Sequence, residues 1–291
     1  MRYYRIQNDG QQSVVAQKSD EMYDLTAVDG GPTSFSDLGD AAELKGIPID
    51  DLVERIISRA PTLPVRQVQD EAIRPIDPAE VWGAGVTYSI SQEARQDEGG
   101  LAESYLNAYE ANRPEVYFKA TPSRTVGPNE SVGIRSDSDW DVPEPELTIV
   151  LFDGEIVGYT IGNDVCSRDI ERENLLYLPQ SKIYANSCAI GPCIATSDTV
   201  DDPHDLEMIL QIRRGEEVIF EDQTSTIEMV RHCEELVGYL KRCNDLPRLT
   251  VLLTGTSIIP PDHITLRQGD HVSIEIEKIG TLENPVEEVP E

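Results

Sequence analysis

The sequence is poor in positive charge. Of its 291 residues, 54 are acidic and 24 are basic, the formal net charge is −30 at pH 7, and only six residues are lysines. Nucleic acids and anionic membranes attract proteins through basic patches, so this balance excludes both as partners. The excess acid is dispersed along the chain, which is typical of proteins in a high-salt cytosol, where salt screens self-repulsion. We expect a cytoplasmic protein that loses stability at low salt.

Long apolar runs and paired cysteines are also missing. We find no secretory signal and no apolar segment long enough to span a membrane. The five cysteines form no CxxC pair, and the four histidines have no metal-ligand spacing. We therefore expect reduced cysteines that act as small buried hydrophobes, and no zinc site.

Prolines divide the chain. Pro61, Pro64 and Pro75 indicate a linker after a small N-terminal α+β domain over residues 1–75, followed by a catalytic domain over residues 76–291. In the first part, the pattern predicts short strands at residues 3–6 and 13–16. It also predicts a helix over residues 50–58 with Asp50 as its N-cap.

The stretch over residues 142–169 has the strongest local signal. Two β-branched, apolar runs, residues 147–152 and 156–161, flank Asp153-Gly154, which predicts a β-hairpin. Glu144 and Glu146 are two residues apart, so their carboxylates share one face of a strand. Asp164 follows at the far end of the second strand.

The register of this hairpin decides whether the three acids meet. A two-residue turn pairs Glu144 with Asn163 and leaves Asp164 on the wrong face. A three-residue loop over residues 153–155, or one bulge near Gly158, pairs Glu144 with Asp164 instead.

Three carboxylates that meet without a nearby cation would repel one another unless a divalent metal neutralised them. Ligation by oxygen alone suits Mg²⁺, Mn²⁺ or Ca²⁺ and disfavours zinc. The alternative is a solvated acidic edge, which is common in so acidic a chain.

Several other residues have functional and ordinary interpretations. Lys119 and Lys182 lie among apolar residues, and Lys182 could stabilise an anion or transfer a proton, although a structural lysine is the alternative. The glycine-rich run 81–88 suggests close approach to a ligand. The turn at residues 254–256 suits a carboxylate or oxyanion, or is a plain loop. Residues 91–112 predict a polar helix, which is either a lid or an ordinary surface helix.

Taken together, several motifs resemble the fumarylacetoacetate hydrolase superfamily. They occur in the order of that family and cover about residues 80–286: Pro143-Glu-Pro-Glu-Leu147, Gly158-Tyr-Thr-Ile-Gly-Asn-Asp-Val-Cys-Ser-Arg-Asp169, Ser181-Lys182, Ile190-Gly-Pro192, Thr254-Gly-Thr256 and Ile279-Gly-Thr-Leu-Glu-Asn-Pro-Val286. The resemblance implies an α+β, β-rich catalytic domain with a rolled mixed sheet. It also implies a homodimer or homotetramer, and a divalent metal, expected to be Mg²⁺, on Glu144, Glu146 and Asp164.

One departure from the family bears on the reaction. Hydrolase members carry an Asn-Tyr-x-x-His motif whose histidine helps to activate water, and here that position is Ser91. Residues 81–88 and 113–119 more closely resemble the archaeal 2-keto-3-deoxy-pentonate dehydratases of the family. The implied reaction is dehydration of such a sugar acid to 2,5-dioxopentanoate.

The resemblance distributes roles over the candidate residues. Glu115 is expected to transfer a proton at C3 or C4, and Lys182 to stabilise the enolate or to protonate the leaving hydroxyl. The residues expected to bind the substrate are Gly85, Thr87, Lys119, Thr254, Gly255 and Thr256.

Three rival functions remain open at this point. The first is a metal-dependent hydrolase, decarboxylase or tautomerase of 2,4-diketo acids. The second is a sugar-acid binding protein without turnover, and the third is a structural role in a halophile.

Overall fold

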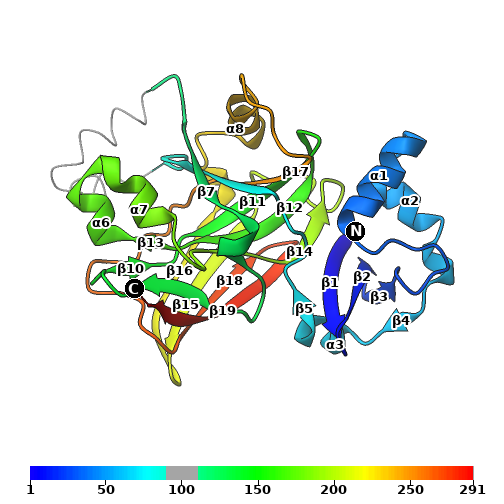
Figure 1. The fold of residues 1–291 in the computed structure, drawn as a ribbon, viewed down its shortest axis with the longest axis horizontal. Coiled ribbons are helices and arrows are strands. Elements are labelled where there is room, and N and C mark those ends of the chain that lie inside the picture. The colour runs from blue at the N-terminus through cyan, green and yellow to red at the C-terminus, as the bar shows by residue number, and fades with distance from the viewer. Residues whose placement is uncertain (90–110, 291) are drawn as a thin grey trace.

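A computed structural model describes residues 1–89 and 111–290 of the chain. Within these ranges a 12-stranded sheet forms the centre of the molecule, and a 5-stranded sheet and a two-stranded ribbon accompany it (Figure 1). The strands of the large sheet are, in spatial order, β4 (Thr62–Leu63), β3 (Glu21–Asp24), β2 (Gln11–Lys18), β1 (Arg2–Asn8), β14 (Cys188–Thr196), β12 (Glu155–Asp164), β11 (Pro145–Phe152), β17 (Leu249–Leu253), β6 (Glu80–Gly85) and β7 (Glu115–Ala120), with β5 (Ala72–Ile73) beside β1 and β8 (Thr125–Val126) beside β14.

The N-terminal region joins this sheet directly. The expected strands at residues 3–6 and 13–16 are confirmed as β1 and β2, and β1 pairs with β14 of the second half of the chain. The large sheet therefore crosses the expected domain boundary at residues 75 and 76, and the division into two domains stays a prediction. The helices of this region are α1 (Phe35–Lys45), α2 (Ile49–Glu54) and α3 (Val65–Asp70).

The expected N-cap at Asp50 was wrong. Pro48 is the N-cap of α2, and Asp50 lies in the first turn of that helix. Its carboxylate accepts a hydrogen bond of 2.8 Å from the hydroxyl of Tyr3 on β1, so it ties the helix to the sheet rather than capping it. Helix α2 ends at Glu54 and is followed by a 3₁₀ turn over Ile57–Arg59.

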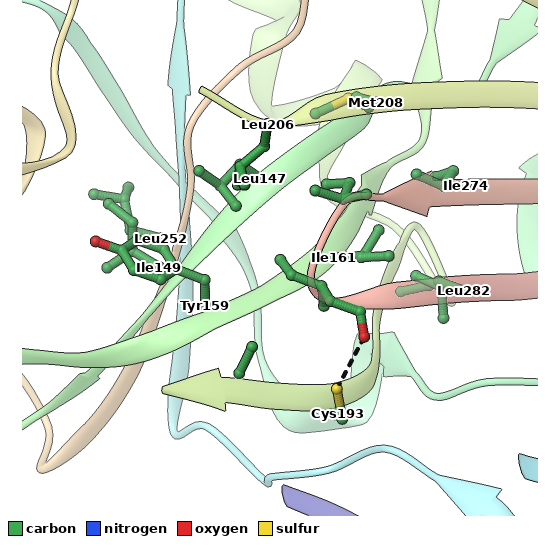
Figure 2. Packing of buried hydrophobic residues seen from close by; sticks show 14 of the residues in the cluster. Leu147, Ile149, Tyr159, Ile161, Cys193, Leu206, Met208, Leu252, Ile274 and Leu282 are labelled. Atoms are coloured by element: carbon green, nitrogen blue, oxygen red, sulfur yellow. Dashed lines mark hydrogen bonds between the residues drawn. The ribbon is translucent and has the colours of Figure 1, made fainter. Parts of the chain in front are cut away.

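The second sheet covers one face of the first. Its strands are, in spatial order, β16 (Glu217–Ser225), β15 (Glu207–Arg214), β18 (Asp270–Ile276), β19 (Gly280–Val289) and β9 (Val132–Arg135). Leu147 and Ile161 of the hairpin share one core with Met208, Ile274 and Leu282 of this sheet (Figure 2). Burial of these apolar side chains stabilises the pair of sheets, and the expected β-rich α+β fold class is confirmed.

The cysteines are all reduced. Four are buried, as expected, and Cys243 is exposed. Cys193 shows the small-hydrophobe role in Figure 2, where its thiol lies in the core and donates to the carbonyl of Ile279 at 3.3 Å.

Short helices flank the end of the hairpin. Helices α6 (Arg168–Glu173) and α7 (Leu178–Lys182) follow β13 (Cys166–Ser167), which pairs with β10 (Asp141–Val142), and in Figure 1 they lie at the opposite end of the molecule from α1 and α2. Helix α8 (Cys233–Leu240) lies between β16 and β17 in the chain. None of the helices in the described ranges has the length and apolar character needed to cross a bilayer. Most of the expected lid or surface helix, residues 91–112, lies outside the described residues.

Candidate metal centre and active-site pocket

A bulge sets the register of the β11–β12 hairpin. Asp153 and Gly154 have φ of 50° and 77°, and Phe152 pairs with Glu155, so the turn has two residues and the three-residue alternative was wrong. The register then shifts by one between Val150 and Leu151, which leaves Val157 as the extra residue. A bulge was expected near Gly158 and is confirmed one residue earlier.

This bulge aligns the first and last acids of the hairpin. The backbone N–H of Asp164 donates to the carbonyl of Glu144 at 2.9 Å. Oxygens of Glu144, Glu146 and Asp164 can all lie within 4.8 Å of one another. Glu146 and Asp164 are fully buried, with exposed fractions of 1% and 0%. Since every donor is a carboxylate oxygen, the cluster fits a hard divalent cation.

The expectation of three acids without a nearby cation was wrong. The ammonium of Lys182 lies 2.5 Å from Glu144 Oε2 and 3.6 Å from Asp164 Oδ2, and that of Lys119 lies 2.5 Å from Asp164 Oδ1. These lysines come from α7 and β7, which are distant in sequence from Glu144. A metal binds the carboxylates in their deprotonated form. In that form the three carboxylates and two ammonium groups leave one net negative charge, which attracts a cation.

The pKa values of Asp164 and Glu146 shift in opposite directions. Burial acts to raise the pKa of Asp164, but the ammonium groups of Lys119 and Lys182 outweigh it and hold that pKa below its ordinary value. Burial raises the pKa of Glu146 well above its ordinary value, and the charges of Asp164 and Glu144 add to the effect. In the described ranges no salt bridge reaches Glu146, whose Oε2 instead accepts the N–H of Gly255 at 2.5 Å.

A pocket with both charged and apolar lining residues opens over the cluster. Most of the residues expected to bind or react line it, and Asp164 lies beneath its floor with no exposed surface. The expected residues in the lining are Gly85, Thr87, Glu115, Glu144, Glu146, Lys182, Gly255 and Thr256.

Glu115 reaches the pocket because Gly85 has no side chain. The two residues pair across β6 and β7, and a Cβ on Gly85 would lie 2.1 Å from Oε2 of Glu115. Burial raises the pKa of Glu115, and the charge of Lys182 opposes this shift. A raised pKa brings a carboxylate closer to the range in which it can both accept and donate a proton.

Two residues do not fit the expected contact with substrate. Lys119 has an exposed fraction of 0% and, besides Asp164, its ammonium bonds the carbonyls of Val165 and Lys182 at 3.0 and 2.6 Å. The hydroxyl of Thr254 donates to the carbonyl of Leu147 at 2.8 Å. Both side chains are committed to the protein and are absent from the lining, so we withdraw them as ligands of the substrate carboxylate.

Three residues of the pocket were missed in the sequence. The hydroxyl of Tyr117 donates to Asp164 Oδ2 at 2.5 Å, and Arg168 forms an ion pair of 2.5 Å with Glu171 on the same helix. The position of Tyr117 between Glu115 and Lys119, at two-residue spacing on one strand, was an available signal. The spacing of Arg168 and Glu171, three residues apart, indicates a helical pair, but nothing local placed it beside the pocket.

The fold and the site together define a class of β-rich enzymes that carry a carboxylate cluster beneath a small pocket. Within this class, the chain belongs to the fumarylacetoacetate (FAA) hydrolase family: the model for the C-terminal region of that family matches residues 80–287.

Relatives resemble the chain over three quarters of its length or more. A "Probable 2-keto-3-deoxyxylonate dehydratase" of Haloferax volcanii is 50% identical over 98% of this chain and 99% of its own. A "2-dehydro-3-deoxy-D-arabinonate dehydratase" of Saccharolobus solfataricus is 49% identical over 76% of each chain. Among solved structures, a 2-keto-3-deoxy-D-arabinonate dehydratase complexed with magnesium and 2,5-dioxopentanoate is 37% identical, covers 100% of both chains and superimposes with a TM-score of 0.84.

Proposed function

We propose that this protein dehydrates a 2-keto-3-deoxy-pentonate to 2,5-dioxopentanoate, also called α-ketoglutarate semialdehyde. The observation that carries the proposal is that Glu115 and Lys182 line the same pocket as the carboxylates of Glu144 and Glu146. A proton-transfer group, a fixed positive charge and a cation site therefore meet in one small cavity. The full-length identity to named dehydratases of this substrate class supports the same reaction.

The metal would be held by Glu144, Glu146 and Asp164. We propose Mg²⁺, with Mn²⁺ or Ca²⁺ as alternatives, because hard carboxylate oxygens are the ligands these ions prefer. When bound there, a divalent cation acts as a Lewis acid toward a 2-keto acid and makes its C3 proton more acidic.

Glu115 would carry the proton through the elimination. As the carboxylate it takes the proton from C3, and as the acid it returns that proton to the C4 hydroxyl, which leaves as water. The raised pKa of Glu115 suits both halves of this step. The aldehyde then forms by a proton shift from C5 to C3 and another from the C5 hydroxyl to C4, so that one water is lost overall.

Lys182 is better suited to stabilising charge than to giving up a proton. Burial acts to lower its pKa, but Asp164, Cys166 and Glu144 outweigh burial and raise it well above the ordinary lysine value. The side chain therefore stays an ammonium ion, and it would face the negative charge that develops on the C2 oxygen.

Four lining residues would position the substrate. Gly85 and Gly255 keep the walls free of side chains, and the hydroxyl of Thr87 is already bonded to the carbonyl of Thr254 at 2.5 Å. Gly255 has φ of 86°, and its N–H is committed to Glu146. The hydroxyl of Thr256 is thus our proposed contact for the substrate carboxylate.

We further propose that the protein works as a homodimer or homotetramer in a high-salt cytosol. The dispersed net charge of −30 supports the high-salt setting. Its partner is a small-molecule 2-keto sugar acid.

The alternative is a hydrolase, decarboxylase or tautomerase that acts on 2,4-diketo acids. The same carboxylate cluster would serve it, but hydrolysis needs another group to activate water. Ser91, at the position where hydrolase members have histidine, lies outside the described residues. Cleavage of an acylpyruvate in place of dehydration would favour this alternative, and tight binding of 2-keto acids without turnover would favour a binding protein.

The first test is an assay for 2,5-dioxopentanoate in high KCl with Mg²⁺ and racemic 2-keto-3-deoxy-pentonate. We expect product with the wild-type protein, no product with EDTA, and no product or metal binding with Asp164→Asn. Asp137→Asn, at an exposed ion pair with Arg135, is the matched control and should keep full activity. Full activity of Asp164→Asn would overturn the metal site.

A further inference from the structure

Lys119 is a lysine with no access to solvent. Its side chain is 0% exposed, and its ammonium lies against Asp164 Oδ1, the carbonyl of Val165 and the carbonyl of Lys182 at 2.5, 3.0 and 2.6 Å. The ammonium donates hydrogen bonds to the two carbonyls and forms an ion pair with Asp164, so all three of these close partners belong to the protein. The charge of Lys119 is therefore fixed in place and serves the protein alone.

A β-bulge in β7 occurs at Lys119. Val81 pairs with Ala120, but Trp82 pairs with Phe118, so Lys119 is the extra residue of a bulge between β6 and β7. A bulge re-aims a side chain relative to the regular strand. It occurs at the residue whose ammonium bonds both the end of β12 and the end of α7.

Lys119 also connects the carboxylate cluster to the backbone of Lys182. Through Asp164 it contacts the carboxylate cluster, and through the carbonyl of Lys182 it holds the backbone of the second lysine. The ammonium of Lys182 in turn lies 2.5 Å from Glu144. The two lysines thus both contact Asp164, and Lys182 also contacts Glu144.

We propose that Lys119 is a positioning residue that supplies part of the positive charge that the metal would supply. It holds the Asp164 side chain in place when no cation is bound, and its positive charge lowers the affinity of the cluster for divalent cations. The inference rests on the metal site of the proposed function and deepens it, because it assigns the site a built-in counter-charge.

Counting charges shows why the two effects belong together. In the deprotonated form that binds a metal, the three carboxylates and both lysines together carry one net negative charge, and without Lys119 the cluster carries two. A buried carboxylate that loses its partner destabilises the metal-free protein. The same extra negative charge strengthens attraction to a divalent cation, because Coulomb energy grows with the charge of the site.

The test compares Lys119→Met with the wild-type protein by thermal unfolding in EDTA and in saturating Mn²⁺, and by calorimetric titration with Mn²⁺. We expect a lower melting temperature in EDTA, a larger rise on adding Mn²⁺ than in the wild-type protein, and a Kd for Mn²⁺ that is lower by about tenfold or more. Lys241→Met, which removes an exposed lysine paired with Glu155, is the control and should leave both quantities unchanged. Equal loss of stability with and without Mn²⁺, with an unchanged Kd, would show a purely structural lysine and overturn the proposal.

A double variant decides the matter if Lys119→Met fails to fold. In EDTA, Lys119→Met/Asp164→Asn removes both charges, and we expect it to be more stable than either single variant. A double variant no more stable than the single ones would overturn the pairing. If the wild-type protein shows no response to Mn²⁺, the metal site of the proposed function fails, whereas this metal-free comparison still tests how Lys119 and Asp164 depend on each other.

Discussion

Three side chains of one short strand have different tasks. Glu115, Tyr117 and Lys119 follow each other at two-residue spacing on β7 and all point toward the acidic cluster. Glu115 lines the pocket, Tyr117 bonds Asp164, and Lys119 is buried behind it. The depth of each residue, rather than its type alone, decides which of them can meet a substrate.

Substitution of Glu115 tests its role in proton transfer. We expect Glu115→Gln to lower kcat by about 10²–10⁴, the usual contribution of a positioned proton-transfer group. Because Glu115 must be ionised to accept the C3 proton, kcat/KM should fall as the pH falls through its pKa. Burial raises that pKa, so the acid limb should lie above the ordinary glutamate range. A pH–rate profile of both proteins measures this.

The control for this experiment is Glu216→Gln, an exposed glutamate in the turn between β15 and β16. It should keep both the rate and the acid limb. If Glu115→Gln kept the wild-type rate and profile, another group would have to transfer the proton.

Asp141 gives a second prediction at this scale, for stability. It is 2% exposed, and in the described part of the chain its Oδ1 has no hydrogen-bond partner. Burial raises its pKa to about 7. The unfolded state releases the Asp141 proton near pH 4, whereas the folded state holds it up to about pH 7. The contribution of this group to the stability of the fold is therefore fully present below pH 4 and is lost as the pH rises through 7. We expect Asp141→Asn to be more stable than the wild-type protein at pH 8 by on the order of a few kcal/mol, and no more stable at pH 4.

Thermal unfolding at the two pH values measures this difference. Asp139→Asn, an exposed neighbour, is the control and should follow the wild-type curve. The same wild-type to Asp141→Asn difference at pH 4 and pH 8 would argue against a protonated Asp141.

At the scale of elements, the turn and the bulge of the hairpin together set the register of its two strands. Asp153 and Gly154 close a two-residue turn that local chemistry predicts. Such a turn alone would pair Glu144 with Asn163. The bulge at Val157 corrects the register by one residue and brings Glu144 opposite Asp164. Strand β12 is also bonded to β14, and that second partner helps to decide where the bulge falls.

Helix α1 begins with a side-chain cap whose contribution to stability can be measured. Ser34 and Asp37 form a capping box: the hydroxyl of Ser34 accepts the N–H of Asp37 at 3.1 Å, and Asp37 accepts the N–H of Ser34 at 3.0 Å. Ser34→Ala removes one half of the box and should lower the free energy of unfolding by about 1 kcal/mol. Denaturant unfolding measures the loss. Ser36→Ala, inside the same helix, is the control and should be neutral or slightly stabilising, and equal effects of the two changes would contradict a capping role.

At the scale of the whole molecule, the large negative net charge affects stability. A net charge of −30 repels itself, and salt reduces the range of that repulsion from about 10 Å at 0.1 M to about 3 Å at 1 M. We expect the melting temperature to rise by several degrees or more between 0.2 and 2 M KCl. Sucrose at equal osmolality is the control, because it favours compact states without screening charge. A melting temperature that responds to sucrose and KCl alike would remove the electrostatic explanation.

The sequence predicted local features more reliably than long-range ones. The strands at the N-terminus and the hairpin each follow from local strand patterns around turn residues, and these are properties of neighbouring residues. The N-cap of α2 could not be placed this way, because Asp50 is used by Tyr3 across the sheet. Continuity of one sheet from β4 to β7 was likewise outside the reach of local patterns.

The sequence by itself therefore determined the acidity of the chain, the spacing of Glu144 and Glu146, and the turn that brings Asp164 back toward them. Only the tertiary structure decided that two lysines offset part of the charge of this cluster, that Lys119 lies beneath the pocket and that Glu115 lies in its wall. Spacing within a strand is fixed by backbone geometry over a few residues. The meeting of β7, β12 and α7 depends on how distant segments pack, and no local pattern encodes that.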